Sequence, residues 1–213
     1  MRPKTNYRVE ISRKVLHVSS ALIPLVYIFI DRETMWWLLV PCVCLIVAIE
    51  ILRQVNPRGR RLFRRCFGVM VRGTEWHRLS GSTYVLVGAL VSVWVFPKTI
   101  AIAGLLVLSI SDSAASLVGL RFGRASFLGK SLAGSFAFFA SSVIILWFAW
   151  PQSHGVALAA ALVATIAEAL PSIRLGRVEL NDNLTIPLLT GATLWLLQRD
   201  AAPVELVNAF LNP

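Results

Sequence analysis

The chain has 213 residues, of which 56% are hydrophobic and 15% charged, and its mean hydropathy of +0.70 excludes an ordinary water-soluble domain. Its net charge of +10 comes without an aromatic-interleaved basic fold, so nucleic acid is not an expected partner. No linker or break in composition divides the sequence, which predicts a single integral-membrane domain over residues 1–213.

Seven apolar runs follow one another along the chain, and each predicts a membrane-spanning helix. They cover residues 15–30, 35–52, 83–96, 99–120, 132–150, 155–170 and 184–197. The third, sixth and seventh are shorter than the roughly 20 residues of a perpendicular span, so we expect them to include polar flanking residues or to cross a thinned bilayer. The predicted fold is an all-α, polytopic membrane bundle of about seven transmembrane helices.

The basic residues are divided unequally between alternate loops. With seven spans, eighteen of the 21 Lys and Arg residues fall on the side of the N-terminus, and only Arg32, Lys98 and Arg199 fall on the other side. Short cytoplasmic loops carry an excess of basic residues, so this pattern places the N-terminus in the cytoplasm and the C-terminus outside. The first run lacks a small-residue cleavage site and is interpreted as a retained signal anchor. In a bacterium the expected location is the inner membrane.

A basic segment between Arg58 and Arg72 follows the second run. Its apolar residues recur at helical spacing, while Arg60, Arg61, Arg64 and Arg65 occupy the opposite face. This pattern indicates an amphipathic helix that lies on anionic lipid. The alternative is a solvated basic loop that only fixes the topology. Both interpretations keep the segment cytoplasmic.

Asp112 lies inside the fourth apolar run. An ionised Asp costs roughly 2.5 to 3.5 kcal/mol at the centre of a membrane helix, so we expect its side chain to face other helices, a cation or water. At 3.6 residues per turn a narrow polar stripe contains Ser109, Asp112, Ser113 and Ser116, and Gly119 continues it. For the small residues the alternative is a helix-packing seam, with Ala115 and Gly119 as a small pair.

A basic, glycine-rich turn separates the fourth run from the fifth. Its candidate phosphate-binding residues are Arg121, Gly123, Arg124, Gly129, Lys130 and Ser131. The turn enters the next helix at its N-terminal end, where backbone N–H groups and the helix dipole favour phosphate. It is not a Walker A loop, because five residues instead of four separate Gly123 from Gly129 and no soluble strand precedes them.

Three further polar clusters are expected at the same membrane face. They comprise Arg13, Lys14 and His17; His77, Ser80, Gly81 and Ser82; and Glu168 with residues 181–183. Taken singly, they have simpler interpretations as topology determinants, as interfacial caps and, for Asp182, as a helix N-cap. Together, basic groups and carboxylates at one membrane surface are what Mg²⁺-nucleotide chemistry requires.

Five sequence blocks resemble, in order, the family of CTP-dependent membrane lipid kinases that includes dolichol kinase, phytol kinase and yeast-type diacylglycerol kinase. The blocks read EISRKVLHVSS, HRLSGSTYVLVG, SISDSAASLVGLRFG, GKSLAGSFAFF and EALPSIRLGRVELNDNLTIPL. The resemblance covers most of the chain. It implies transfer of the γ-phosphate of CTP to the hydroxyl of a lipid alcohol such as diacylglycerol, a polyprenol or phytol, and the choice of CTP rests on the resemblance alone.

The resemblance also implies roles for single residues. The family's Arg-Lys pair falls on Arg13 and Lys14, and its intramembrane acid falls on Asp112. Its following glycine falls on Gly119, and its basic-Ser turn falls on Lys130 and Ser131. Its late acidic block falls on Glu168, Asp182 and Asn183. Other members often read D-D-N in the last block. Asn181 replaces the first acid here, which leaves Asp182 as the metal candidate of that block.

The resulting hypothesis is that Asp112, with Glu168 or Asp182, holds Mg²⁺ on the CTP phosphates while one carboxylate orients the lipid hydroxyl. Which carboxylate does so is left open. The catalytic candidates are Asp112, Asp182, Arg13 and Lys14, and the nucleotide-binding candidates are Arg13, Lys14, His77, Ser80, Gly119, Arg121, Gly123, Lys130 and Ser131.

Two alternatives are retained. A CTP:phosphatidate cytidylyltransferase also uses CTP at a membrane, but its long acidic and histidine-glycine signature is not visible. A small transporter coupled to protons or cations also places an acid in midspan. Against a transporter, no inverted repeat is apparent, and the polar groups cluster at one face instead of along a path.

Overall fold

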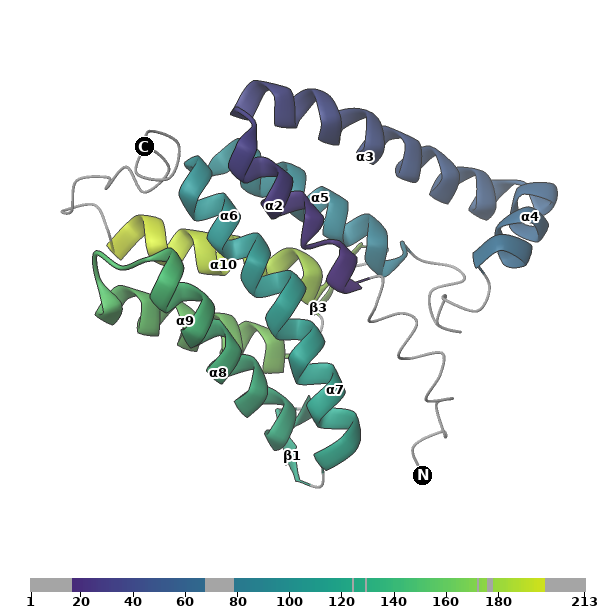
Figure 1. The fold of residues 1–213 in the computed structure, drawn as a ribbon. Helices are drawn as coiled ribbons and strands as arrows, with labels where there is room; N and C mark the ends of the chain where they lie inside the picture. The colour runs from purple at the N-terminus through teal and green to yellow at the C-terminus, as the bar shows by residue number, and fades with distance from the viewer. Residues whose placement is uncertain are drawn as a thin grey trace.

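The computed structural model describes residues 17–67, 79–123, 125–128, 130–171, 173–175 and 178–197. Its helices are α2 (Leu22–Phe29), α3 (Arg32–Val55), α4 (Pro57–Phe67), α5 (Gly81–Val95), α6 (Lys98–Leu106), α7 (Asp112–Phe122), α8 (Leu132–Ala149), α9 (His154–Ala169) and α10 (Asp182–Leu197). Most of each predicted apolar run is helical (Figure 1). The all-α class is therefore confirmed.

Three helices are long and apolar enough to cross a membrane. They are α3 with 24 residues, the continuous helix Lys98–Phe122 with 25, and α8 with 18. The helix His17–Phe29, α5 and α9 are apolar but shorter. These lengths support a membrane protein, and the count of about seven crossings stays a prediction.

The continuous helix Lys98–Phe122 forms the centre of the bundle. It packs against α2, α5, α8 and α10 (Figure 1), and Ala103, Val107 and Leu108 are completely buried. A π-helical segment, η2 (Val107–Ser111), joins α6 to α7 immediately before Asp112. The sequence pattern predicted a regular helix here. The wider turn changes the register between Ser109 and Asp112, and π segments of this kind are frequent at functional sites.

Glycines allow α7 and α8 to approach each other closely. A Cβ atom at Gly134 would lie 2.8 Å from the Ala115 carbonyl oxygen and 3.4 Å from Gly119 Cα. Real Cβ contacts are longer, so any side chain at Gly134 would separate the helices. Ala115 and Gly119 therefore belong to a helix-packing seam, which fixes where α7 ends relative to the start of α8.

Two short antiparallel hairpins, which the sequence analysis did not predict, connect consecutive helices. β1 (Ser126–Phe127) pairs with β2 (Lys130–Ser131) between α7 and α8. β3 (Ile173–Leu175) pairs with β4 (Val178–Leu180) between α9 and α10. Both hairpins precede a helix that begins at a candidate site residue or directly after one.

Contacts between helix ends show which loops share a face. At one end, Asn183 at the start of α10 donates to the Gly81 carbonyl at the start of α5 over 3.1 Å. At the other end, Lys98 at the start of α6 donates to the Ile28 carbonyl near the end of α2 over 2.9 Å. The starts of α5 and α10 therefore lie at one end of the bundle, and the start of α6 lies beside the end of α2 at the other. The number of crossings and the assignment of one end to the cytoplasm stay predictions.

The α7–α8 seam yields a stability prediction. Gly134→Val should lower the free energy of unfolding in detergent by about 1 to 3 kcal/mol, because the new side chain overpacks the contact with Ala115. Gly155→Val is the matched control, since a Cβ at helical Gly155 meets nothing within 4 Å. Equal unfolding midpoints for the two variants would contradict the close approach.

Candidate active site

Lys130 on β2 joins two carboxylates that come from different helices. Its Nζ atom lies 2.9 Å from Glu168 Oε1 and 2.9 Å from Asp182 Oδ2. Glu168 lies at the end of α9 and is 3% exposed, whereas Asp182 is the first residue of α10. The structure thus brings together three predicted site residues. Lys130 comes from the connection between α7 and α8, and the two acids come from α9 and α10.

The environment of Lys130 favours its charged form. Burial acts to lower the pKa of Lys130, but the charges of Asp182 and then Glu168, with the hydrogen bond to Glu168, raise it above its ordinary value. The charge of Asp112 acts in the same direction, so this acid also contributes to the field at Lys130. The ammonium group therefore stays protonated at physiological pH.

The remaining carboxylate oxygens have partners of their own. Ser135 on α8 donates to Glu168 Oε2 over 3.3 Å, and the Asn183 backbone N–H donates to Asp182 Oδ1 over 3.0 Å. Asn181 directly precedes α10, and its side-chain oxygen accepts from the same Asn183 N–H over 2.9 Å. Asn181 thus shares the capping role that was the simpler interpretation of Asp182, whose other oxygen binds Lys130.

Asp112 faces the first helix. Its Oδ2 atom lies 3.1 Å from His17 Nε2, and Asp112 is 5% exposed. The same nitrogen lies 3.4 Å from the Leu108 carbonyl oxygen, so both neighbours are acceptors and Nε2 carries a proton. One turn further along, the hydroxyls of Ser20 and Ser109 are 2.9 Å apart. The sequence pattern predicted His17 at this face but gave no indication of its pairing with Asp112.

Ser131 lies close to Gly119 of α7 and to Gly123, which directly follows that helix. Ser131 Oγ accepts from the Gly134 N–H over 3.1 Å and caps α8. A Cβ at Gly119 would lie 2.6 Å from this oxygen, and one at Gly123 would lie 2.7 Å from Ser131 Cβ. Here the two glycines serve close packing, and their nucleotide-binding role stays a prediction.

The other predicted residues are distributed differently. Arg13, Lys14, His77, Arg124 and Gly129 lie outside the described residues. Arg121 is exposed, with its guanidinium carbon 5.6 Å from the Phe122 ring centre.

A second buried polar cluster surrounds Glu50. Its Oε1 atom accepts from the Ser80 N–H over 3.1 Å and from the Thr83 hydroxyl over 3.3 Å. Its Oε2 atom accepts from Arg53 Nε over 2.7 Å. Ser80 therefore belongs to a structural cluster that fixes the start of α5. The i, i+3 spacing of Glu50 and Arg53 was the available sequence signal.

The carboxylates of the site are too few to enclose a metal ion by themselves, but they suit a Mg²⁺ ion that is bound mainly through phosphate. Among the described residues, no group of three or more His, Cys, Asp or Glu side chains is arranged to hold a metal ion. The predicted metal set of Asp112, Glu168 and Asp182 is therefore not a closed protein cage. Mg²⁺ generally takes one or two carboxylates together with waters and substrate phosphates, so this oxygen-donor set fits a nucleotide-bound Mg²⁺.

An apolar pocket of about 490 Å³ lies beside the Lys130–Ser131 strand. It is lined by Phe122, Ala125, Leu132, Ala133 and Phe136. Phe122 and Phe136 are mostly exposed, as expected for side chains that meet lipid tails. Its lining comes from the end of α7, the start of α8 and the connection between them, and Leu132 follows Lys130 and Ser131 in the sequence.

Known proteins share much of this sequence. An uncharacterised protein of Rickettsia prowazekii is 30% identical over 191 residues, which cover 86% of this chain and 92% of that protein. CTP-dependent diacylglycerol kinase 1 of Saccharomyces cerevisiae is 32% identical over 65% of this chain and 49% of its own length. The Schizosaccharomyces pombe protein of the same name is 28% identical over 70% of this chain and 74% of its own length. No family model and no solved structure matches the chain.

The fold and site define a helical membrane protein with a cluster of charged side chains at one end of its bundle. The match spans about half of the S. cerevisiae kinase and about three quarters of the S. pombe kinase. The named relatives, which are phosphotransferases, support the CTP-dependent lipid kinase family for this chain, and the R. prowazekii protein matches it over most of both lengths.

The charge state of Lys130 gives a pH prediction. Its raised pKa means that the stability contributed by its ion pairs is fully present below the ordinary lysine value of about 10.4 and is lost as pH rises through the higher folded-state value. Lys130→Met should lower the thermal midpoint by a constant amount between about pH 7 and pH 10, and by less above that range. A difference that disappears by about pH 8 would contradict the assignment.

Proposed function

We propose that this chain transfers the γ-phosphate of CTP to the hydroxyl of a membrane lipid alcohol. The observation that carries the proposal is the pairing of Lys130 with Glu168 and Asp182 in the turn that matches the family's basic-Ser motif. The names of the yeast relatives support CTP as donor and diacylglycerol as one acceptor class. A polyprenol and a phytol-like alcohol remain the other candidate acceptors.

Lys130 is the proposed binding group for the CTP phosphates. Its ammonium group has three N–H donors, and it contacts Glu168 and Asp182. A bound Mg²⁺ would supply positive charge against the charge that develops on the phosphates during transfer. Glu168 and Asp182 would hold the metal, which releases Lys130 to bind phosphate. Arg13 and Lys14 are proposed to supply further positive charge.

Asp112 is the proposed third acid of the site. Its contact with His17 fixes one carboxylate oxygen, and its charge acts on Lys130. Asp112 either ligates the metal or orients the lipid hydroxyl, and both roles require the ionised carboxylate. The lipid hydroxyl would lose its proton to such an acceptor as its oxygen bonds to the γ-phosphorus, while the bond from that phosphorus to the β–γ bridging oxygen breaks and CDP leaves.

The lipid substrate is proposed to enter from the bilayer. The apolar pocket beside Lys130 and Ser131 offers a surface for hydrocarbon next to the charged site. The excess of basic residues in the loops at this end favours the cytoplasmic face, and the apolar helices favour several membrane crossings.

A labelling experiment tests the reaction. Purified protein with Mg²⁺ is incubated with a panel of lipid alcohols and phosphatidate, in parallel with CTP labelled at the γ or the α phosphate, and the lipids are extracted. Label from the γ position alone is expected, and the labelled lipid identifies the acceptor. Label from the α position would instead support a cytidylyltransferase. No label beside active controls would favour the transporter.

A substitution tests the role of Asp112. Asp112→Asn should reduce phosphoryl transfer by at least about 100-fold without reducing the amount of inserted protein, because a neutral side chain enters the membrane more easily. Asp31→Asn is the matched control. Asp31 caps α3 at the other end by accepting from the Thr34 N–H, a role that Asn also fills. Wild-type turnover in Asp112→Asn would contradict the assignment.

A further inference from the structure

Helix α4 is held at the end of α3 by specific contacts. α4 begins at Pro57, two residues after α3 ends at Val55. Arg60 donates from Nε to the Arg53 carbonyl over 3.3 Å and from Nη2 to the Gln54 carbonyl over 3.1 Å. These bonds satisfy carbonyl groups in the last turn of α3. The helix α4 therefore lies at the corner visible at the end of α3 in Figure 1.

A buried ion pair fixes the rotation of α4. Arg53, which pairs with Glu50, is 1% exposed, and its guanidinium carbon lies 4.8 Å from the Phe63 ring centre. The Phe63 side of α4 consequently faces α3. This arrangement directs other residues of the short helix away from the bundle.

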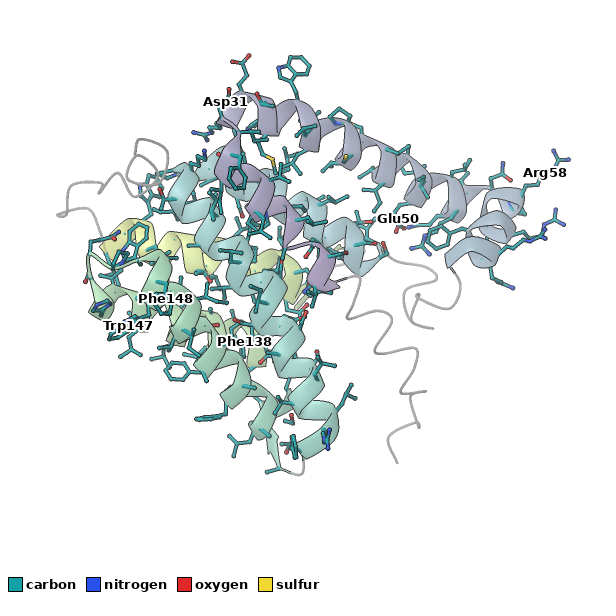
Figure 2. The ribbon with its side chains drawn as sticks, in the orientation of Figure 1. Asp31, Glu50, Arg58, Phe138, Trp147 and Phe148 are labelled. Atoms are coloured by element: carbon teal, nitrogen blue, oxygen red, sulfur yellow. The ribbon has the colours of Figure 1, made fainter. Side chains whose placement is uncertain are left out.

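The outward residues carry uncompensated positive charge. Pro57–Phe67 contains five arginines and no acid, and Arg58, Arg61 and Arg65 are exposed. Within the described part of the chain, no acidic side chain forms an ion pair with these three. Figure 2 shows Arg58 extending away from the bundle at the start of α4.

The end of α3 places these charges at a membrane surface. Leu45, Leu52 and Val55 are 63%, 52% and 78% exposed on α3, so apolar side chains reach outward up to the last residue of this 24-residue helix. Exposed apolar surface on a helix long enough to span is typical of contact with lipid, and this contact would extend nearly to the start of α4. The next layer of a bilayer is the headgroup region.

We propose that α4 is a binding surface for anionic phospholipid headgroups, contacted by Arg58, Arg61 and Arg65. The charges are complementary, and the helix lies at the depth where these headgroups occur. The surface attracts anionic lipid by charge instead of by a shaped pocket, so lysine serves in place of arginine. The proposal does not depend on the reaction that the chain catalyses.

Local lipid composition tests the proposal in the full chain. A fluorophore is attached to the natural Cys66 on α4 in a Cys42→Ala/Cys44→Ala background, and the protein is placed in bilayer nanodiscs that contain phosphatidylcholine and phosphatidylglycerol. Quenching by nitroxide-labelled phosphatidylglycerol is compared with quenching by phosphatidylcholine labelled at the same acyl carbon. At Cys66 the quenching ratio should favour phosphatidylglycerol by at least about two-fold and should fall towards one in 1 M salt, where the screening length is about 3 Å.

Three comparisons make the result decisive. A fluorophore at Cys42, which is about 20 Å from the end of α3, should give a ratio near one. The triple variant Arg58→Gln/Arg61→Gln/Arg65→Gln should lose the enrichment at Cys66, and Arg58→Lys/Arg61→Lys/Arg65→Lys should keep it. Equal ratios at Cys66 and Cys42, or an unchanged ratio in the Gln variant, would overturn the proposal. So would loss of the enrichment on addition of CTP, which would make α4 a nucleotide surface.

Discussion

The site depends on one electrostatic constraint, which is that a partly buried lysine must be matched by carboxylates. Lys130 meets Glu168 from α9 and Asp182 from α10, and it enters the site on the hairpin that joins α7 to α8. Neither acid is near Lys130 in the sequence, so the pairing fixes the positions of two hairpins and three helix ends at once. In the proposed function, Lys130 would bind phosphate and the two carboxylates would hold the metal.

The packing of the bundle brings these groups to one end. Ala115, Gly119 and Gly134 let α7 and α8 approach closely, which places Lys130 at the entrance to α8. Asn183 ties the start of α10 to the Gly81 carbonyl, and Glu50 binds the Ser80 N–H just before it. This chain of contacts connects the end of α3 to the residue beside Asp182. The polar clusters at this end therefore support one another although they come from distant parts of the sequence.

Helical runs and single site residues were predictable from the sequence, but their pairings were not. Hydrophobicity identified the helices because lipid-facing spans need long apolar stretches, and Asp112 was conspicuous because a charge inside such a stretch is costly. The hairpins depend on two or three backbone pairings each and leave little pattern in side-chain types. The contact of His17 with Asp112 joins residues 95 positions apart, so only the packing of the first helix reveals it. Likewise, the shared capping role of Asn181 follows from backbone geometry at α10.

The central claim is that Lys130 binds the phosphates of CTP. The most direct test is the equilibrium dissociation constant of CTP with Mg²⁺, measured by calorimetry without a lipid acceptor, for the wild type and Lys130→Met. Lys98→Met is the matched control, because Lys98 binds the Ile28 carbonyl at the other end of the bundle. Loss of a charged hydrogen bond should raise the dissociation constant of Lys130→Met by about 10- to 150-fold and leave that of Lys98→Met unchanged. An unchanged constant in a folded Lys130→Met protein would contradict the account.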